Sequence, residues 1–169
     1  GIRHRKTRED DEASIPSVRG EGMVVRREAD EVTIPDFPKI DGLVAWKMDV
    51  MYRVTAASGS PILQRVSQWV TRSWNGTETL DSLYDYGEDS YESLDFKIAQ
   101  GVISMITTML PKCIALRDNS RHGDKRTPAT LTALQVIRVH SRLQEIMNAA
   151  QVTERYLRGR QALFLIAES

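Results

Sequence analysis

Residues 41–59 read DGLVAWKMDVMYRVTAASG, and this stretch decides the fold class. Its apolar side chains return at steps of three and four residues, which places them on one face of a helix; they are Leu43, Trp46, Val50, Val54 and Ala57. Asp41 is a suitable N-cap, and Gly59 suits the left-handed residue that often follows a helix. The sequence therefore predicts a helix over about residues 42–57.

Similar start and stop signals continue along the chain. Ser60 and Pro61 supply a cap and a first-turn proline for a second predicted helix, and Asn75 and Gly76 stop it. Ser93 can cap a third helix, whose apolar face continues until a proline at position 111 ends it. We expect a polar, net-basic loop over residues 111–127.

Two more helices complete the predicted set. Thr127 and Pro128 repeat the cap-plus-proline start of a fourth and longest helix, which runs to about residue 150. A last helix is expected from about Gly159. Its apolar face meets the end of the chain before any cap, which suggests an unfinished helix; a completed helix that docks onto the core is the alternative. This face consists of Leu163, Phe164 and Ile166.

We find no alternating strand pattern, so the predicted fold is all-α, a small bundle of about five helices spanning residues 32–169. Residues 1–31 combine blocks of like charge with few apolar side chains and are predicted to form a disordered arm. Residues 32–38 contain two prolines around Phe37, which favours an extended segment with the aromatic ring packed on the domain. The predicted core includes Trp46, Val50, Val66, Trp69, Ile98 and Val102.

The composition is that of a globular domain: of 169 residues, 41% are hydrophobic and 27% charged. No apolar stretch reaches the roughly 20 residues that span a bilayer, and the basic first residues lead into acidic ones, so neither a transmembrane helix nor a secretory signal is predicted. The single cysteine, Cys113, allows no internal disulfide and no cysteine-based zinc site. We expect a reducing, cytoplasmic location.

The zero net charge conceals an asymmetry between the two halves of the chain. Residues 1–95 carry 12 basic and 18 acidic side chains, whereas residues 96–169 carry 11 and 5. The first part therefore has a net charge of minus six and the second a net charge of plus six. Such opposite charges indicate electrostatic contacts within one molecule or between copies; an ordinary mixed-charge surface is the alternative.

Candidates for catalysis are few. The histidines His4, His122 and His140 and the thiol of Cys113 are not accompanied by a recognised base or orienting partner. The acidic connector, residues 77–95, lacks the spacing of a calcium loop and is predicted to be a solvated linker. We therefore predict no catalytic residues, no cofactor and no metal site, and a chain that is not an enzyme.

Two basic groups could contact RNA phosphates: Arg155, Arg158 and Arg160 near the C-terminus, and Lys125 and Arg126 in the predicted loop. They lack interleaved aromatic residues apart from Tyr156, so the expected contact is weak, non-specific and salt-dependent. Charge that only increases solubility is the alternative.

Several sequence blocks follow one another in a distinctive order. The first is FPKIDGLVAWKM at residues 37–48, an extended Pro/Phe segment followed by Gly and a first-helix Trp. It is followed by TAASG at 55–59, WV at 69–70, ESLDFKIA at 92–99 and YLRGRQALFLI at 156–166. The order of these blocks resembles the Gag-like capsid domains of copia-type LTR retrotransposons. The aromatic residue often found before that Trp is absent, and residues 111–127 look like an insertion.

This resemblance implies a structural protein from the N-terminal part of a Gag-Pol polyprotein. Such domains are helical, self-associate into capsid-like shells around element RNA and perform no chemistry. The implied partner is a second copy of the chain, with RNA bound by phosphate contacts and no membrane. The alternative is a host helical accessory subunit that docks onto a larger protein complex.

Overall fold

The computed structural model describes residues 27–123 and 127–169, and this part of the chain is all-helical. It consists of α-helices and two short 3-10 turns, and no strand occurs among the described residues. In chain order they are α3 (Leu43–Ala57), α4 (Leu63–Thr71), η2 (Ser82–Tyr84), η3 (Asp89–Tyr91), α5 (Glu92–Gly123), α6 (Pro128–Thr153) and α7 (Gly159–Glu168). The predicted fold class is confirmed.

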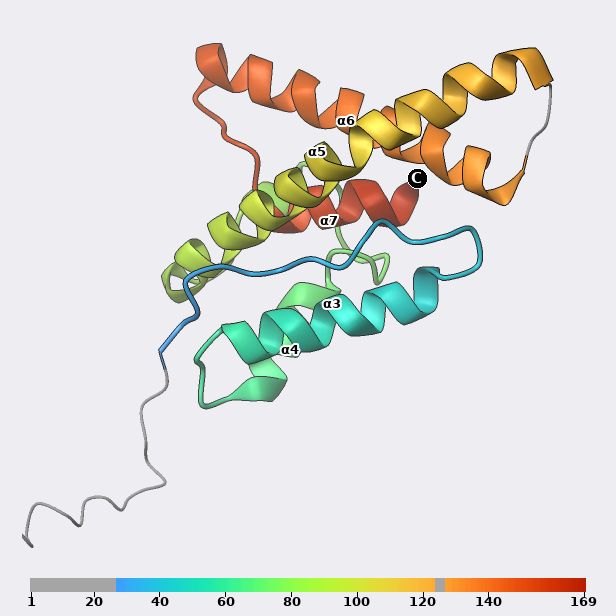
Figure 1. The fold of residues 1–169 in the computed structure, drawn as a ribbon. Helices are drawn as coiled ribbons and strands as arrows, with labels where there is room; N and C mark the ends of the chain where they lie inside the picture. Colours follow the sequence, from blue (N-terminus) through green and yellow to red (C-terminus); the bar gives the residue numbers. More distant parts are fainter. Residues whose placement is uncertain (1–26, 124–126) are drawn as a thin grey trace, which may run out of the picture.

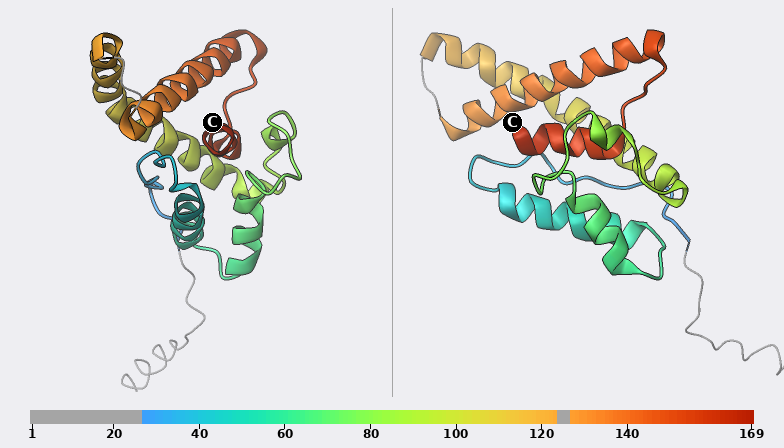
Figure 2. Two further views of the ribbon diagram at one scale, coloured as in Figure 1. Left: turned by 90° about the vertical axis from the view of Figure 1, so that its right-hand side faces the viewer. Right: turned by 180° about the vertical axis from the view of Figure 1, so that it is seen from behind.

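The helices form two packed groups joined through an extended segment. α3 packs against α4, while α6 runs back across α5 and α7 lies against α5 (Figures 1 and 2). Residues 29–38, which we name the strap, run between α3 and α5 in Figure 1. Because few residues of α3 touch α5 directly, the strap supplies much of the apolar surface that joins the groups.

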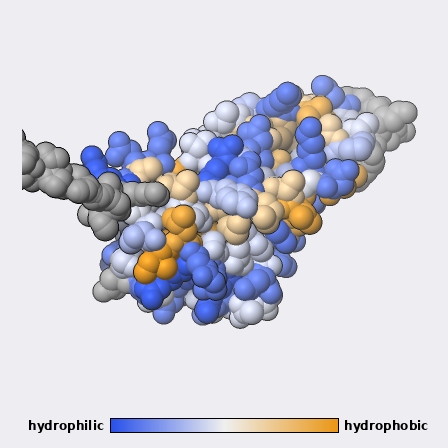
Figure 3. Space-filling model, turned by 90° about the horizontal axis from the view of Figure 1, so that it is seen from below, coloured by the Kyte–Doolittle hydropathy of each residue, from blue (hydrophilic) through white to orange (hydrophobic). Residues whose placement is uncertain are grey.

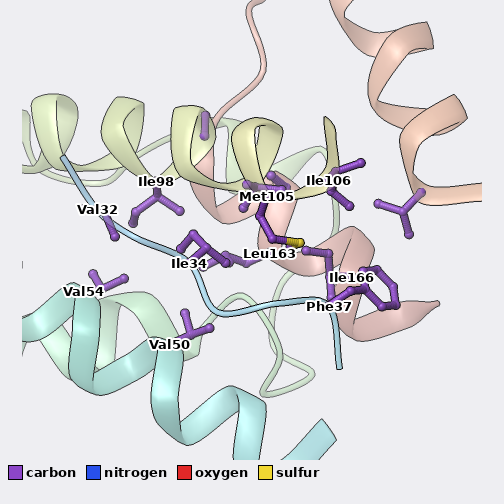
Figure 4. Close-up of a cluster of buried hydrophobic side chains, with 14 of the residues drawn as sticks. Val32, Ile34, Phe37, Val50, Val54, Ile98, Met105, Ile106, Leu163 and Ile166 are labelled. Carbon is purple, nitrogen blue, oxygen red and sulfur yellow. The ribbon is translucent and has the colours of Figure 1, made fainter. Parts of the chain in front are cut away.

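The core lies along the strap. Val32, Ile34 and Phe37 point between the side chains of α3 and those of α5 and α7 (Figure 4). All six residues predicted for the core are buried, each with at most 6% of its surface exposed. Phe37 is also buried, as expected, and its backbone N–H lies 3.4 Å from the sulfur of Met109.

A glycine lets the strap lie close to α5. A Cβ atom placed on Gly101 would overlap the carbonyl oxygen of Val32 and approach the side chain of Ile34 to 2.9 Å. Only glycine permits this approach of backbone to helix without a shift of the strap. This role of Gly101 was not predicted from the sequence.

The folded body begins before the predicted boundary at Val32. The backbone N–H of Ala29 donates to the carbonyl of Ala57 at 2.8 Å, and the Lys97 ammonium donates to the Ala29 carbonyl at 2.7 Å. Lys97 also pairs with Glu28 at 2.6 Å. The predicted disorder of residues 1–26 lies outside the described residues.

The predicted end of the third helix at Pro111 is wrong. α5 continues to Gly123, with Pro111 inside it, so most of the predicted loop over 111–127 is helical. Pro111 is exposed, while Met105 and Cys113 on either side of it are buried in the core. Packing on both sides therefore outweighs the roughly 3 kcal/mol that a proline costs inside a helix.

The other predicted helix signals agree only in part with the structure. Gly42 and not Asp41 is the N-cap of α3, α5 begins at Glu92 so that Ser93 lies inside it, and α4 ends at Thr71, before Asn75 and Gly76. Gly59 has the left-handed φ of 68° that was predicted after α3. Thr127 caps α6, since its hydroxyl oxygen accepts from the N–H of Thr130 at 3.1 Å. Ser60 does not start α4: its hydroxyl accepts from the N–H of Ile62 in a turn, and the helix begins at Leu63. The apolar face of α7 is covered, because Leu163 and Ile166 are buried.

α5 is long and apolar enough to cross a membrane by length and composition alone, although no such helix was predicted. Core helices of helical bundles meet the same criterion. Here Ile98, Val102 and Ile106 are buried, and α5 packs against both α6 and α7.

Candidate functional site

A buried carboxylate from α5 holds the start of α7. Asp95 is only 1% exposed, and its two oxygens accept from the backbone N–H groups of Gly159 and Arg160 at 3.0 and 3.1 Å. These are unpaired donors of the first helical turn, so Asp95 acts as a cap supplied by another helix. Burial raises the pKa of Asp95, while the two N–H donors and the nearby Arg160 and Arg158 oppose that rise.

Arg160 is the second buried charge at this place. Its guanidinium lies 4.8 Å from the ring centre of Trp69 and donates to the carbonyls of Trp69 at 3.2 Å and Asp85 at 2.6 Å. With 4% of its surface exposed, it joins α7 to α4 and to the acidic connector. Burial lowers the pKa of the Arg160 guanidinium, and Asp95 is the largest opposing influence.

Two further arginines hold the connector from outside. Arg155 and Arg158 lie over the ring of Tyr84, at 4.0 and 4.4 Å from its centre, and Arg158 also donates to the Tyr84 carbonyl at 3.1 Å. Arg155 pairs with Asp81 at 3.1 Å on the surface. We name Arg155, Arg158 and Arg160 the arginine clamp.

The aromatic residues and the first turn of α7 complete the attachment. The Trp69 indole N–H donates to the carbonyl of Tyr86 at 2.8 Å, and its ring stacks on Tyr91 at 4.6 Å. Gln161 caps the N–H of Arg158 and donates from its amide nitrogen to the Leu80 carbonyl at 2.9 Å. The acidic connector is therefore fastened to the body at several points and is not the solvated linker that we predicted.

These contacts change the interpretation of the basic residues. The burial of Arg160 contradicts its predicted RNA contact, because its two terminal nitrogens donate to protein carbonyls and its Nε is buried without a partner. Arg155 and Arg158 retain exposed or half-exposed surface while they pack on Tyr84. Lys125 and Arg126 lie outside the described residues.

Of the groups considered for chemistry, the structure describes the side chains of Cys113 and His140. Cys113 is buried, and burial raises the pKa of its thiol despite the neighbouring Lys112, so the reactive thiolate is disfavoured. His140 is partly buried on α6, whereas His4 and the side chain of His122 lie outside the described part. No cluster of three or more metal-ligating side chains occurs within residues 27–123 and 127–169 that the structure describes.

The outward side of α3 is a second surface of interest. The core side of α3 buries Trp46, Val50 and Val54, yet its opposite side is also apolar. Three residues of α3 at intervals of four form an exposed stripe, Val44 (77% exposed), Met48 (45%) and Tyr52 (65%), and Ile40 (49%) is exposed in the turn before the helix. We name these four residues, together with Leu63 of α4 (46% exposed), the α3 face.

A groove of about 470 Å³ borders the α3 face where α3 meets α4. Apolar groups of Met51, Tyr52, Ala56 and Leu63 line it. In the view from below, which looks onto the α3 and α4 side of the molecule, hydrophobic side chains gather in patches between hydrophilic ones (Figure 3). This face was not predicted, because the periodicity of the α3 sequence was assigned only to the stripe that enters the core.

No protein-family model, curated protein or solved structure matches this chain. Its function must therefore be argued from the residues themselves.

Proposed function

We propose that this chain is a structural module that works by associating with copies of itself, in the manner of the Gag-like capsid domains that its sequence blocks resemble. The observation that carries the proposal is the α3 face. A solvated helix normally presents polar side chains to water, whereas Val44, Met48 and Tyr52 repeat on the outward side without an intervening charge.

The arrangement of the core supports a rigid building block. Asp95 and Arg160 fix α7 and the connector to α5 and α4, so the outer surfaces keep a defined spacing. A defined spacing of contact surfaces is what closed or repeating assembly requires. In this proposal the module assembles in the cytoplasm and encloses element RNA.

RNA contact in this proposal does not depend on Arg160. The basic residues that remain for phosphate contact are Lys125 and Arg126, with the exposed parts of Arg155 and Arg158. Such contacts would be non-specific and would weaken as salt rises.

Light scattering after size-exclusion chromatography tests the proposal. We expect the mean mass of the purified chain to rise with concentration, and added RNA to favour larger particles that electron microscopy can image. A chain that stays monomeric at high concentration across salt and pH, with or without RNA, would contradict self-association. If it instead formed a stoichiometric complex with an unrelated protein, the accessory-subunit alternative would be supported.

A further inference from the structure

We propose that the α3 face is the contact between two copies of this chain, paired by a twofold axis with their α3 helices antiparallel. This inference rests on the proposed function and specifies the surface and partner through which self-association starts. A twofold contact uses the same patch on both copies, so a single apolar face is sufficient.

The size of the α3 face agrees with a dimer contact. From their exposed fractions, its five side chains present roughly 400 to 700 Å² of surface, given about 150 to 250 Å² for a fully exposed large side chain. Two copies that cover each other's face would bury roughly 800 to 1,400 Å² in total, a range that includes the roughly 1,000 Å² expected of a specific interface. Single exposed apolar residues are common on monomeric proteins, but the area of this apolar patch is at the upper end of what monomers expose.

The charges that border the stripe indicate its register. Asp49 and Arg53 lie on one side of the stripe and pair with each other at 2.8 Å, both about half exposed. In an antiparallel pair of helices, equal sides of the two helices face one another. A register that sets Met48 opposite Tyr52 of the second copy brings Asp49 of each copy near Arg53 of the other.

The same register gives the groove an occupant. The groove lies beside Tyr52 and Leu63, and the Met48 side chain of the second copy would lie over it. Methionine is unbranched and flexible, which suits it to filling an irregular apolar groove. The twofold axis repeats this contact, so each copy both gives and receives a Met48 side chain.

Sedimentation equilibrium of the full chain and of Met48→Glu tests the surface. Because a charge would be buried at the centre of the contact, we expect the dimer dissociation constant to rise about a hundredfold or more. Met48 is partly exposed on the outward side, so folding should persist, which circular dichroism and tryptophan fluorescence can check. Val152→Glu on α6, at a residue 86% exposed, is the matched control and should leave the constant unchanged.

A charge exchange tests the register. Asp49→Arg should weaken the dimer about fivefold at low salt, because it sets like charges together. Adding Arg53→Asp should restore wild-type affinity. If the double variant dimerised no more tightly than Asp49→Arg alone, the proposed register would be wrong.

The outcomes separate this inference from the proposed function. If Met48→Glu associates as tightly as the wild type, the α3 face is not the contact, although self-association stands. If the wild type is monomeric and only an unrelated protein covers this face, both proposals are overturned.

Discussion

Asp95 and Arg160 are charged residues in the core, and each is paired there by several groups. Asp95 receives two backbone N–H groups of α7, and Arg160 donates to two carbonyls and lies on the Trp69 ring. Removing one member of such a buried group lowers the free energy of unfolding by more than the interaction itself contributes. The reason is that the remaining polar groups stay buried without partners. These two residues are therefore positions where a substitution affects the whole fold.

Replacement of Asp95 by alanine should lower the free energy of unfolding by about 3 kcal/mol or more. The N–H groups of Gly159 and Arg160 would lose their acceptors. Asp95→Asn keeps one acceptor oxygen and should cost less. Urea unfolding measures both; equal stability of the alanine variant and the wild type would show that water satisfies this end of α7.

The pKa of Asp95 predicts a pH dependence with a definite sign. Burial raises the pKa of the folded carboxyl above 3.8, so between that value and the raised one the folded state holds more protons than the unfolded state. The stability of the wild type relative to Asp95→Asn should therefore fall as pH rises through this window and level off above it. A relative stability that grows with pH there would mean that the N–H donors outweigh burial.

At the scale of the elements, α5 shows what a local pattern predicts well and where it fails. The core stripe of α3 and the cap of α6 depend on neighbours in sequence, and both were predicted correctly. The continuation of α5 beyond Pro111 depends on packing against α6. The arginine clamp depends on hydrogen bonds between residues about 75 to 90 positions apart in the sequence. Periodicity contains no information on such distant contacts; only the opposite charges of the two halves indicated them.

Replacing Pro111 by alanine should stabilise the protein by about 1 to 3 kcal/mol. Alanine restores an N–H donor for the helix and removes the contact of the proline ring with the preceding turn. Lys112→Ala at the adjacent exposed position is the control and should change stability by less than about 0.5 kcal/mol. Lower stability of Pro111→Ala would show that α5 needs the proline's geometry to pack on α6.

At the scale of the whole molecule, the arginine clamp joins the two halves of opposite charge. The basic linker between α6 and α7 holds the acidic connector, so part of the charge asymmetry is compensated within one molecule. This changes the expected effect of removing those arginines. Removal of the buried Arg160 should destabilise the fold, whereas an arginine that only increases solubility or binds RNA could be removed at little cost in stability.

Arg160→Gln should destabilise the protein by about 2 to 4 kcal/mol, because the carbonyls of Trp69 and Asp85 lose a charged donor. Arg138→Gln, at an exposed position on α6, is the matched control and should change stability little. Thermal unfolding distinguishes the two variants. If Arg160→Gln unfolds like the control while RNA retention falls, Arg160 serves a ligand and not the fold.

Self-association is the claim on which the functional account depends, and sedimentation velocity of the purified wild-type chain over a wide concentration range tests it most directly. We predict a sedimentation coefficient that rises with concentration from the monomer to the dimer and larger species. A single monomeric boundary at every concentration and salt condition would contradict the account.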